Sequence, residues 1–299
     1  MKTTWGGDWT EQKLDAFEKY VNVYLTIMNK HRDKYNWKLI YFDAFAGSGS
    51  RAADTENADN FPLFEELGIS KDEIAVYKGA AERVVCITQR GFDYYYFIEK
   101  DEISRKELEE RLNTIEHENK LKMIFRDHDA NEQIHTMARA MKKDKNLYAL
   151  TLLDPFGMQV DWSAIESLAG TNTDLWILIP SGVIINRLLD REGKLTHINK
   201  LISFFGMSEE EIRNEFYREE NKSIPSLFEI DALKRKTEEP ITKITELYIK
   251  RLKMLFPQVT EKPLEMKNTR NVSIYHFAFA SNNPTAKKIA SDIIGRISK

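Results

Sequence analysis

The sequence predicts an α/β protein whose core is a doubly wound, mainly parallel sheet with a late antiparallel strand. Short apolar runs alternate with segments of helical periodicity as far as residue 179, which is the pattern of strand–helix–strand units. A glycine-rich turn follows the first run, and a last alternating run, residues 272–280, precedes the final helix. These observations indicate a Rossmann-like sheet, in which ligands bind at the carboxyl ends of the strands.

Each predicted strand is an apolar run bounded by polar or glycine-containing segments. The other five strands cover residues 37–45, 94–99, 121–125, 147–154 and 174–179. The predicted helices cover residues 10–31, 80–91, 101–119, 131–141, 162–168 and 284–298. In the first helix, apolar residues recur at three- and four-residue steps from Leu14 and Phe17 to Met28, so we expect it to pack on the core. Thr10 is its predicted N-cap, with Lys13 where an ideal capping box has Glu.

Two segments interrupt this alternation. Residues 51–78 begin polar and acidic and continue with a short apolar patch. We interpret them as an excursion beside the glycine-rich turn, either a mobile lid or an ordered surface segment. Residues 187–262 have a helical pattern and many charges, which predicts a helical insert or small subdomain. The main domain then comprises residues 1–186 and 263–299.

The composition restricts the partners and the compartment. A formal net charge of −3 over 299 residues gives no global basic field, so a nucleic-acid substrate requires a local basic patch. The insert supplies candidates for such a patch, although at this net charge a solvated helix face is the favoured interpretation: Lys194, Lys200, Lys234, Arg235, Lys236, Lys250, Arg251 and Lys253. One cysteine, Cys86, excludes internal disulfides and Cys-rich zinc sites. We expect no metal site, no membrane span and a cytoplasmic location.

The first chemical motif is the turn from Asp43 to Gly49, which reads DAFAGSG. Glycines let a backbone turn tightly and approach a ligand closely. A phosphate-binding P-loop is excluded because no Lys follows Gly49. The dinucleotide fingerprint is weakened, because Ala52 stands at its third glycine position. A plain strand-to-helix turn is the structural alternative.

Acidic residues follow the next two strands. Glu99 ends the second strand, where a carboxylate can accept hydrogen bonds from ribose hydroxyls. Asp127 and Asp129 follow the third strand, and either can accept from an adenine amino group or simply cap the next helix. Several acids at successive strand ends favour an adenosine-containing cofactor.

The fourth strand ends in the motif DPFG, from Asp154 to Gly157. Pro155 has a fixed φ and restricts the backbone of the preceding residue, so the chain has little conformational freedom where it leaves the strand. We expect Asp154 and the Pro155 carbonyl to accept hydrogen bonds from a planar amine, and Phe156 to stack on its ring. A simple Asp-Pro turn is the alternative.

The motifs DAFAGSG, FIEKD, DHDAN and LLDPFG, in this order, resemble those of class I S-adenosylmethionine-dependent methyltransferases. DPFG is similar to the Asp/Asn-Pro-Pro-Tyr/Phe motif of enzymes that methylate exocyclic amines, and closer still to that of tRNA guanine N2-methyltransferases. More narrowly, WTEQKL, LLDPFGMQVDWSAIESLA, DLWILIPSGVIINRLL and YHFAFAS resemble the three-Cys-motif partner protein (TcmP) family. That resemblance spans most of the chain and implies a methyltransferase-like domain with a helical, winged-helix-like insert. Ser48 departs from the Pro that many relatives have in AGPG.

The resemblance also implies a role for each motif. The methionine part of S-adenosylmethionine would be held by the motif-one residues Asp43, Phe45, Ala46, Gly47, Ser48 and Gly49. Glu99 would hold the ribose and Asp129 the adenine. The acceptor amine would meet Asp154, Pro155 and Phe156. Methylation of cytosine at C5 is rejected, because that chemistry requires a nucleophilic Cys in the loop after the fourth strand and Cys86 lies elsewhere.

Three functional hypotheses follow from these motifs. The first is an N-methyltransferase acting on an exocyclic amine of a nucleic-acid base or a similar planar group. The second is a non-catalytic partner that has a methyltransferase fold and binds cofactor or a protein encoded nearby. The third, a nicotinamide-dependent dehydrogenase, is the weakest, since no motif places a catalytic acid or base.

Overall fold

The computed structural model describes residues 8–48, 79–115, 122–155, 157–219, 234–236, 239–268 and 270–298. Three features singled out from the sequence lie outside these ranges. They are the excursion 51–78, Gly49 at the end of the first motif, and Phe156.

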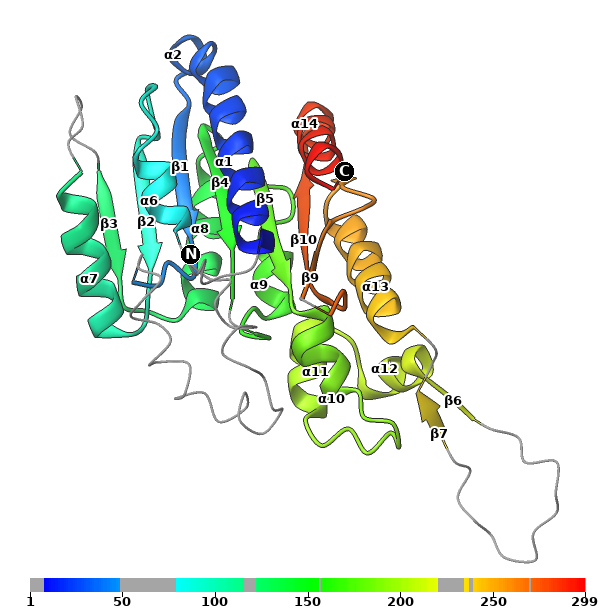
Figure 1. The fold of residues 1–299 in the computed structure, drawn as a ribbon. Coiled ribbons are helices and arrows are strands. Elements are labelled where there is room, and N and C mark those ends of the chain that lie inside the picture. The colour runs from blue at the N-terminus through cyan, green and yellow to red at the C-terminus, as the bar shows by residue number, and fades with distance from the viewer. Residues whose placement is uncertain are drawn as a thin grey trace, which may run out of the picture.

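One large sheet forms the centre of the molecule (Figure 1). Its strands are β1 (Lys38–Asp43), β2 (Tyr94–Ile98), β3 (Met123–Arg126), β4 (Leu147–Leu153), β5 (Thr173–Ile179), β8 (Gln258–Val259), β9 (Leu264–Lys267) and β10 (Ser273–Ser281). Among the described strands the order is β3-β2-β1-β4-β5-β10-β8, and β9 also pairs with β10. Strands β1 to β5 are parallel, and β10 is antiparallel to β5. The predicted mainly parallel sheet with a late antiparallel strand is therefore confirmed.

The chain reverses its direction of winding at β1, the feature that creates a ligand crevice in doubly wound sheets. The pairing register decides which residues meet there. Asp43, the last residue of β1, lies opposite Phe97 of β2 and Leu152 of β4. Glu99 and Asp154 each stand two residues beyond these partners. Register alone therefore brings three of the predicted acidic residues to one edge.

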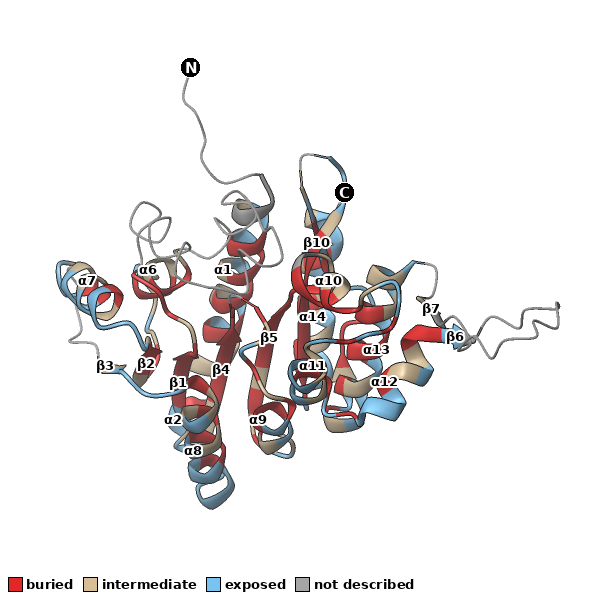
Figure 2. Ribbon diagram, turned by 90° about the horizontal axis from the view of Figure 1, so that it is seen from below, coloured by how far each residue is buried: buried red, intermediate tan, exposed pale blue. Residues whose placement is uncertain are grey.

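Helices cover both faces of the sheet. They are α1 (Asp8–Asn29), α2 (Arg32–Tyr35), α6 (Ala80–Val85), α7 (Glu102–Asn113), α8 (Ala130–Lys143), α9 (Trp162–Ser167) and α14 (Pro284–Ile297). Helices α1 and α6 lie on one face, and α8 and α9 on the other (Figure 2). The described part of α1 already begins at Asp8, so Thr10 lies inside the helix and its prediction as N-cap is wrong.

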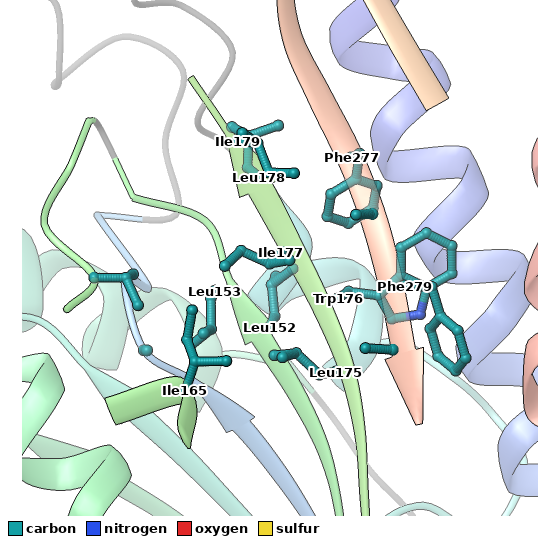
Figure 3. Close-up of a cluster of buried hydrophobic side chains, with 14 of the residues drawn as sticks. Leu152, Leu153, Ile165, Leu175, Trp176, Ile177, Leu178, Ile179, Phe277 and Phe279 are labelled. Atoms are coloured by element: carbon teal, nitrogen blue, oxygen red, sulfur yellow. The ribbon is translucent and has the colours of Figure 1, made fainter. Parts of the chain in front are cut away.

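An aromatic core fixes the position of α1. Trp176 of β5 lies beside Phe277 and Phe279 of β10 (Figure 3), with ring centroids 4.7 Å and 5.2 Å away. Phe17 of α1 meets Trp176 edge-on at 6.3 Å, and Tyr20 lies 4.9 Å from Phe279. All five rings are buried. Helix α1 therefore packs on the core, as its apolar periodicity predicts.

A mainly helical region follows β5. It contains the π-helix η2 (Ser181–Ile185), α10 (Asn186–Leu188), α11 (Ile198–Phe205), α12 (Glu209–Phe216), the antiparallel strands β6 (Tyr217–Glu219) and β7 (Lys234–Lys236), and α13 (Pro240–Leu255). These helices gather beyond the β10 side of the sheet (Figure 1). Strand β8, inside the predicted range 187–262, pairs with β10 in the main sheet. None of the described helices has the length and apolarity needed to span a membrane.

Candidate functional site

The carboxyl ends of β1 to β4 surround a pocket of about 590 Å³. Its lining comes from the segments that follow these four strands and includes Phe45, Glu99, His128, Asp129 and Gln159. A pocket of this size suits a small-molecule ligand or cofactor. The lining thus includes Phe45, predicted to contact the methionine part of a cofactor, together with Glu99 and Asp129, predicted to hold its ribose and adenine. Asp43 and Asp154 do not line this pocket.

The first motif makes a tight turn beside this pocket. Gly47 has a φ of 63°, in the left-handed region that glycine adopts without strain. The Ala46 N–H donates to the carbonyl of Ile98 at 3.0 Å, and the Gly47 N–H donates to Glu99 Oε2 at 2.9 Å. Ser48 is fully buried. The turn is therefore tied to the end of β2.

Glu99 has a structural task as well as its place in the pocket. Its Oε2 accepts from Gly47, and its Oε1 accepts from the Asp101 N–H at 2.8 Å. The carboxylate therefore connects the turn of the first motif to the segment that follows β2. The bracing role was not predicted from the sequence.

Asp127 and Asp129 have different surroundings in the structure. Asp129 Oδ1 accepts from the Asn131 N–H at 2.9 Å and from the Glu132 N–H at 3.4 Å, so it is the N-cap of α8. Asp129 also lines the pocket. Asp127 pairs instead with its exposed neighbour His128, 2.9 Å from the ring Nδ1. The capping interpretation of Asp129 is thus confirmed, and a ligand contact is compatible with it.

A buried charged cluster lies where β1 and β4 end. Asp154 Oδ2 accepts from Lys13 Nζ at 2.5 Å, and the two side chains are 6% and 2% exposed. Asp154 Oδ1 is buried and has no hydrogen-bond partner among the described residues. Asp43 accepts from the Phe45 N–H at 3.2 Å and from the Tyr41 hydroxyl at 3.0 Å. This cluster therefore contains two carboxylates and one ammonium.

Burial raises the pKa of Asp43 to about 7, and the neighbouring Asp154 charge adds to this effect. The Phe45 N–H, the Tyr41 hydroxyl and Lys13 oppose it by stabilising the carboxylate. Burial also raises the pKa of Asp154, against the lowering effect of Lys13. With both carboxylates ionised, the cluster of Asp43, Asp154 and Lys13 has one negative charge in excess. A buried site with excess negative charge is complementary to a cation.

Lys13 is the residue of this site that the sequence analysis missed as a functional group. A usable signal was present: Phe17 and Tyr20 follow Lys13 by four and seven residues, so all three lie on one face of α1. A lysine on the buried face of an amphipathic helix needs a partner.

The remaining predicted residues are less informative. Pro155 is buried directly after Asp154, and nothing described tests the Phe156 prediction. Among the residues that the structure describes, no group of three or more His, Cys, Asp or Glu side chains could hold a metal ion. Cys86 is exposed.

Several basic candidates of the helical region have local partners. Lys194 pairs with Glu192, and Lys253 pairs with Glu261. Lys236 donates to the Asn186 side chain at 2.6 Å. Arg251 lies over the Trp162 ring and donates to the Gly206 carbonyl. Each of these four side chains therefore contributes to local structure.

Comparison with known proteins assigns neither a family nor a function to this chain. No protein-family model matches the chain, and no curated protein matches its sequence. The site itself therefore carries the functional argument.

Proposed function

We propose that this protein is an S-adenosylmethionine-dependent methyltransferase that N-methylates an exocyclic amine of a nucleic-acid base or a similar planar group. The observation that carries the proposal is the buried pair Asp43 and Asp154 at the carboxyl ends of the strands. Lys13 forms an ion pair with Asp154 and also stabilises the Asp43 carboxylate electrostatically, and Ala44, next to Asp43, lines the pocket. Such a crevice is where doubly wound sheets bind ligands.

The residues present fit this cofactor. S-adenosylmethionine has a sulfonium and an α-ammonium group, and the cluster around Asp43 has one negative charge in excess. The turn at Gly47 brings the backbone close to the pocket, while Glu99 and Asp129 line it with carboxylate oxygens. In the proposal Asp43 holds the methionine part, Glu99 the ribose and Asp129 the adenine. When bound, the cofactor supplies an electrophilic methyl group.

The chain's own residues then align the acceptor. Asp154 Oδ1, which has no partner among the described residues, accepts a hydrogen bond from the acceptor amine. This contact directs the nitrogen lone pair and offsets positive charge that develops on nitrogen as the methyl group is transferred. The Pro155 carbonyl and the Phe156 ring complete the acceptor site in this proposal.

We also propose that the chain has the architecture implied by its resemblance to the TcmP family. The antiparallel β10 at the end of the parallel series supports a methyltransferase-like sheet. The order of α11, α12, the β6–β7 pair and α13 supports a winged-helix-like insert. Both features agree with what the TcmP resemblance implies.

Calorimetric titration tests the cofactor assignment. We expect binding of S-adenosylmethionine and none of NAD. Asp43→Asn should abolish binding, whereas Asp127→Asn, a matched change of an Asp outside the pocket lining, should not. Because a cation at Asp43 requires its ionised form, affinity should fall about tenfold for each pH unit below 7. Unchanged binding by Asp43→Asn would contradict the assignment.

One observation favours the second candidate, a protein that binds the cofactor without transferring its methyl group. Lys13 donates a hydrogen bond to Asp154 Oδ2, so this oxygen is already occupied. Transfer of tritiated methyl groups to total RNA, DNA or protein from a lysate separates the two candidates. Label in RNA or DNA supports the enzyme. Cofactor binding without label in any pool supports the partner.

A further inference from the structure

The two oxygens of Asp154 have different surroundings. Oδ2 accepts from Lys13 Nζ at 2.5 Å, whereas Oδ1 is buried with no hydrogen-bond partner among the described residues. A buried polar atom without a partner is rare in native proteins and requires an explanation, such as a bound water, an ion or a functional role. One oxygen of the Asp154 carboxylate is thus paired with Lys13, and the other, Oδ1, is the one that a ligand could contact.

Packing holds the Lys13 ammonium in place. Phe17 and Tyr20, on the same face of α1, are buried against Trp176 and Phe279. Lys13 itself is 2% exposed. Because α1 is anchored one and two turns further along, its lysine is a fixed component of the site and not a mobile surface group.

We propose that Lys13 is a positioning residue: it keeps Asp154 ionised and occupies its Oδ2, so that only Oδ1 faces the acceptor. In this way the site selects a neutral planar amine over an alkylammonium as the methyl acceptor. The proposal rests on the methyltransferase function proposed above and deepens it by naming the charge class of the substrate.

The charges near the site support this selection. Among the described residues, the groups in contact with Asp154 or Asp43 are Lys13 from α1, the Tyr41 hydroxyl from β1 and the Phe45 N–H, and the charge of Asp154 raises the pKa of Asp43. Two carboxylates and one ammonium leave one negative charge, which the cationic cofactor neutralises. An alkylammonium acceptor would then add an uncompensated buried charge, which is costly. A neutral amine donates an N–H to Oδ1 and adds no charge.

Carboxyl ¹³C NMR of the ligand-free protein tests the positioning role without any assay of methyl transfer. The titration of Asp154 is followed in an Asp43→Asn background, so that the midpoint belongs to one group. Lys13→Met should shift this midpoint upward, and Lys13→Arg should restore it. An unmoved midpoint in Lys13→Met would overturn the proposal, even if cofactor binding and transfer are found.

Chemical rescue provides a second measurement that does not depend on the folding of the Met variant. Lys13→Ala lacks the atoms of n-propylammonium. We therefore expect this cation to raise the melting temperature of Lys13→Ala in a saturable manner, but not that of the unmodified protein or of Lys13→Ala/Asp154→Asn. Absence of rescue would contradict a specific ammonium position at Asp154.

The substrate class is tested by competing acceptors. With S-adenosylmethionine bound, the unmodified protein should methylate single-stranded nucleic acid and leave spermidine and a lysine-rich peptide unmodified. Transfer to the alkylammonium acceptors would overturn the selection. Failure to bind S-adenosylmethionine would instead refute the proposed function and leave the NMR and rescue results interpretable.

Discussion

Replacing Asp43 by Asn should stabilise the protein at neutral and alkaline pH while it removes cofactor binding. Asp43 is buried between the Tyr41 hydroxyl and the Phe45 N–H, and Asp154 lies close enough to raise its pKa. The Asn side chain has nearly the same shape and retains an oxygen for the Phe45 N–H. The substitution therefore removes a buried negative charge with little change in packing.

The magnitude follows from the pKa of Asp43, which folding raises from 3.8 to about 7. An acid whose pKa is raised in the folded state destabilises that state as it ionises. This loss of unfolding free energy is absent below pH 3.8, grows as the pH rises towards 7, and is complete above it. The rise in the pKa of Asp43 corresponds to about 4 kcal/mol of unfolding free energy. At pH 8 the free energy of unfolding of Asp43→Asn should thus exceed that of the unmodified protein by up to this amount.

Urea unfolding followed by circular dichroism at pH 4, 6 and 8 measures the effect. The two proteins should have equal midpoints near pH 4 and diverge as the pH rises. Asp127→Asn is the matched control, since Asp127 is exposed and pairs only with His128 among the described residues. A stability difference that stays constant with pH would refute the argument, because it would show that Asp43 ionises without penalty.

The other predictions concern packing and buried polar groups. Lys13→Met should cost about 3–5 kcal/mol of unfolding free energy by leaving the Asp154 carboxylate unpaired, and the double change Lys13→Met/Asp154→Leu should recover most of it in urea titrations. His276 is buried against two hydroxyls with a pKa lowered from 6.5 to about 4. A lowered histidine pKa favours folding above pH 6.5, so stability should fall by up to about 3 kcal/mol between pH 6.5 and 4, and His276→Gln should flatten this part of the pH profile. Gly182→Ala would place a Cβ 1.9 Å from a backbone carbonyl and should destabilise by about 1–3 kcal/mol. At Gly295 in α14 an added Cβ meets nothing within 4 Å, so Gly295→Ala should instead stabilise by about 0.5–1 kcal/mol; urea unfolding measures both glycine variants.

Much of the fold could be predicted because it depends on local periodicity. The central strands of the parallel series, β1, β4 and β5, are short apolar runs buried on both faces over most of their length, and the segments between the strands have helical spacing. The position of Glu99 and Asp154 at the edge beside Asp43 follows from strand order and register. Sequence analysis therefore located the pocket from its strand ends.

The contacts that give the site its charge could not be predicted in the same way. Lys13 and Asp154 are 141 residues apart, and only the packing of α1 on the sheet brings them together. The bond from the Gly47 N–H to Glu99 is likewise a tertiary contact. Ends of elements were the weakest predictions, as Thr10 shows, because capping depends on where the first turn begins.

The aromatic contact between α1 and β10 has a consequence for synthesis of the chain on the ribosome. Phe277 and Phe279, on which Phe17 and Tyr20 pack, are translated more than 250 residues after them. Until β10 has emerged, α1 can pack on Trp176 of β5 but lacks the rings of Phe277 and Phe279. The packing that holds Lys13 beside Asp154 is therefore complete only after β10 has been made.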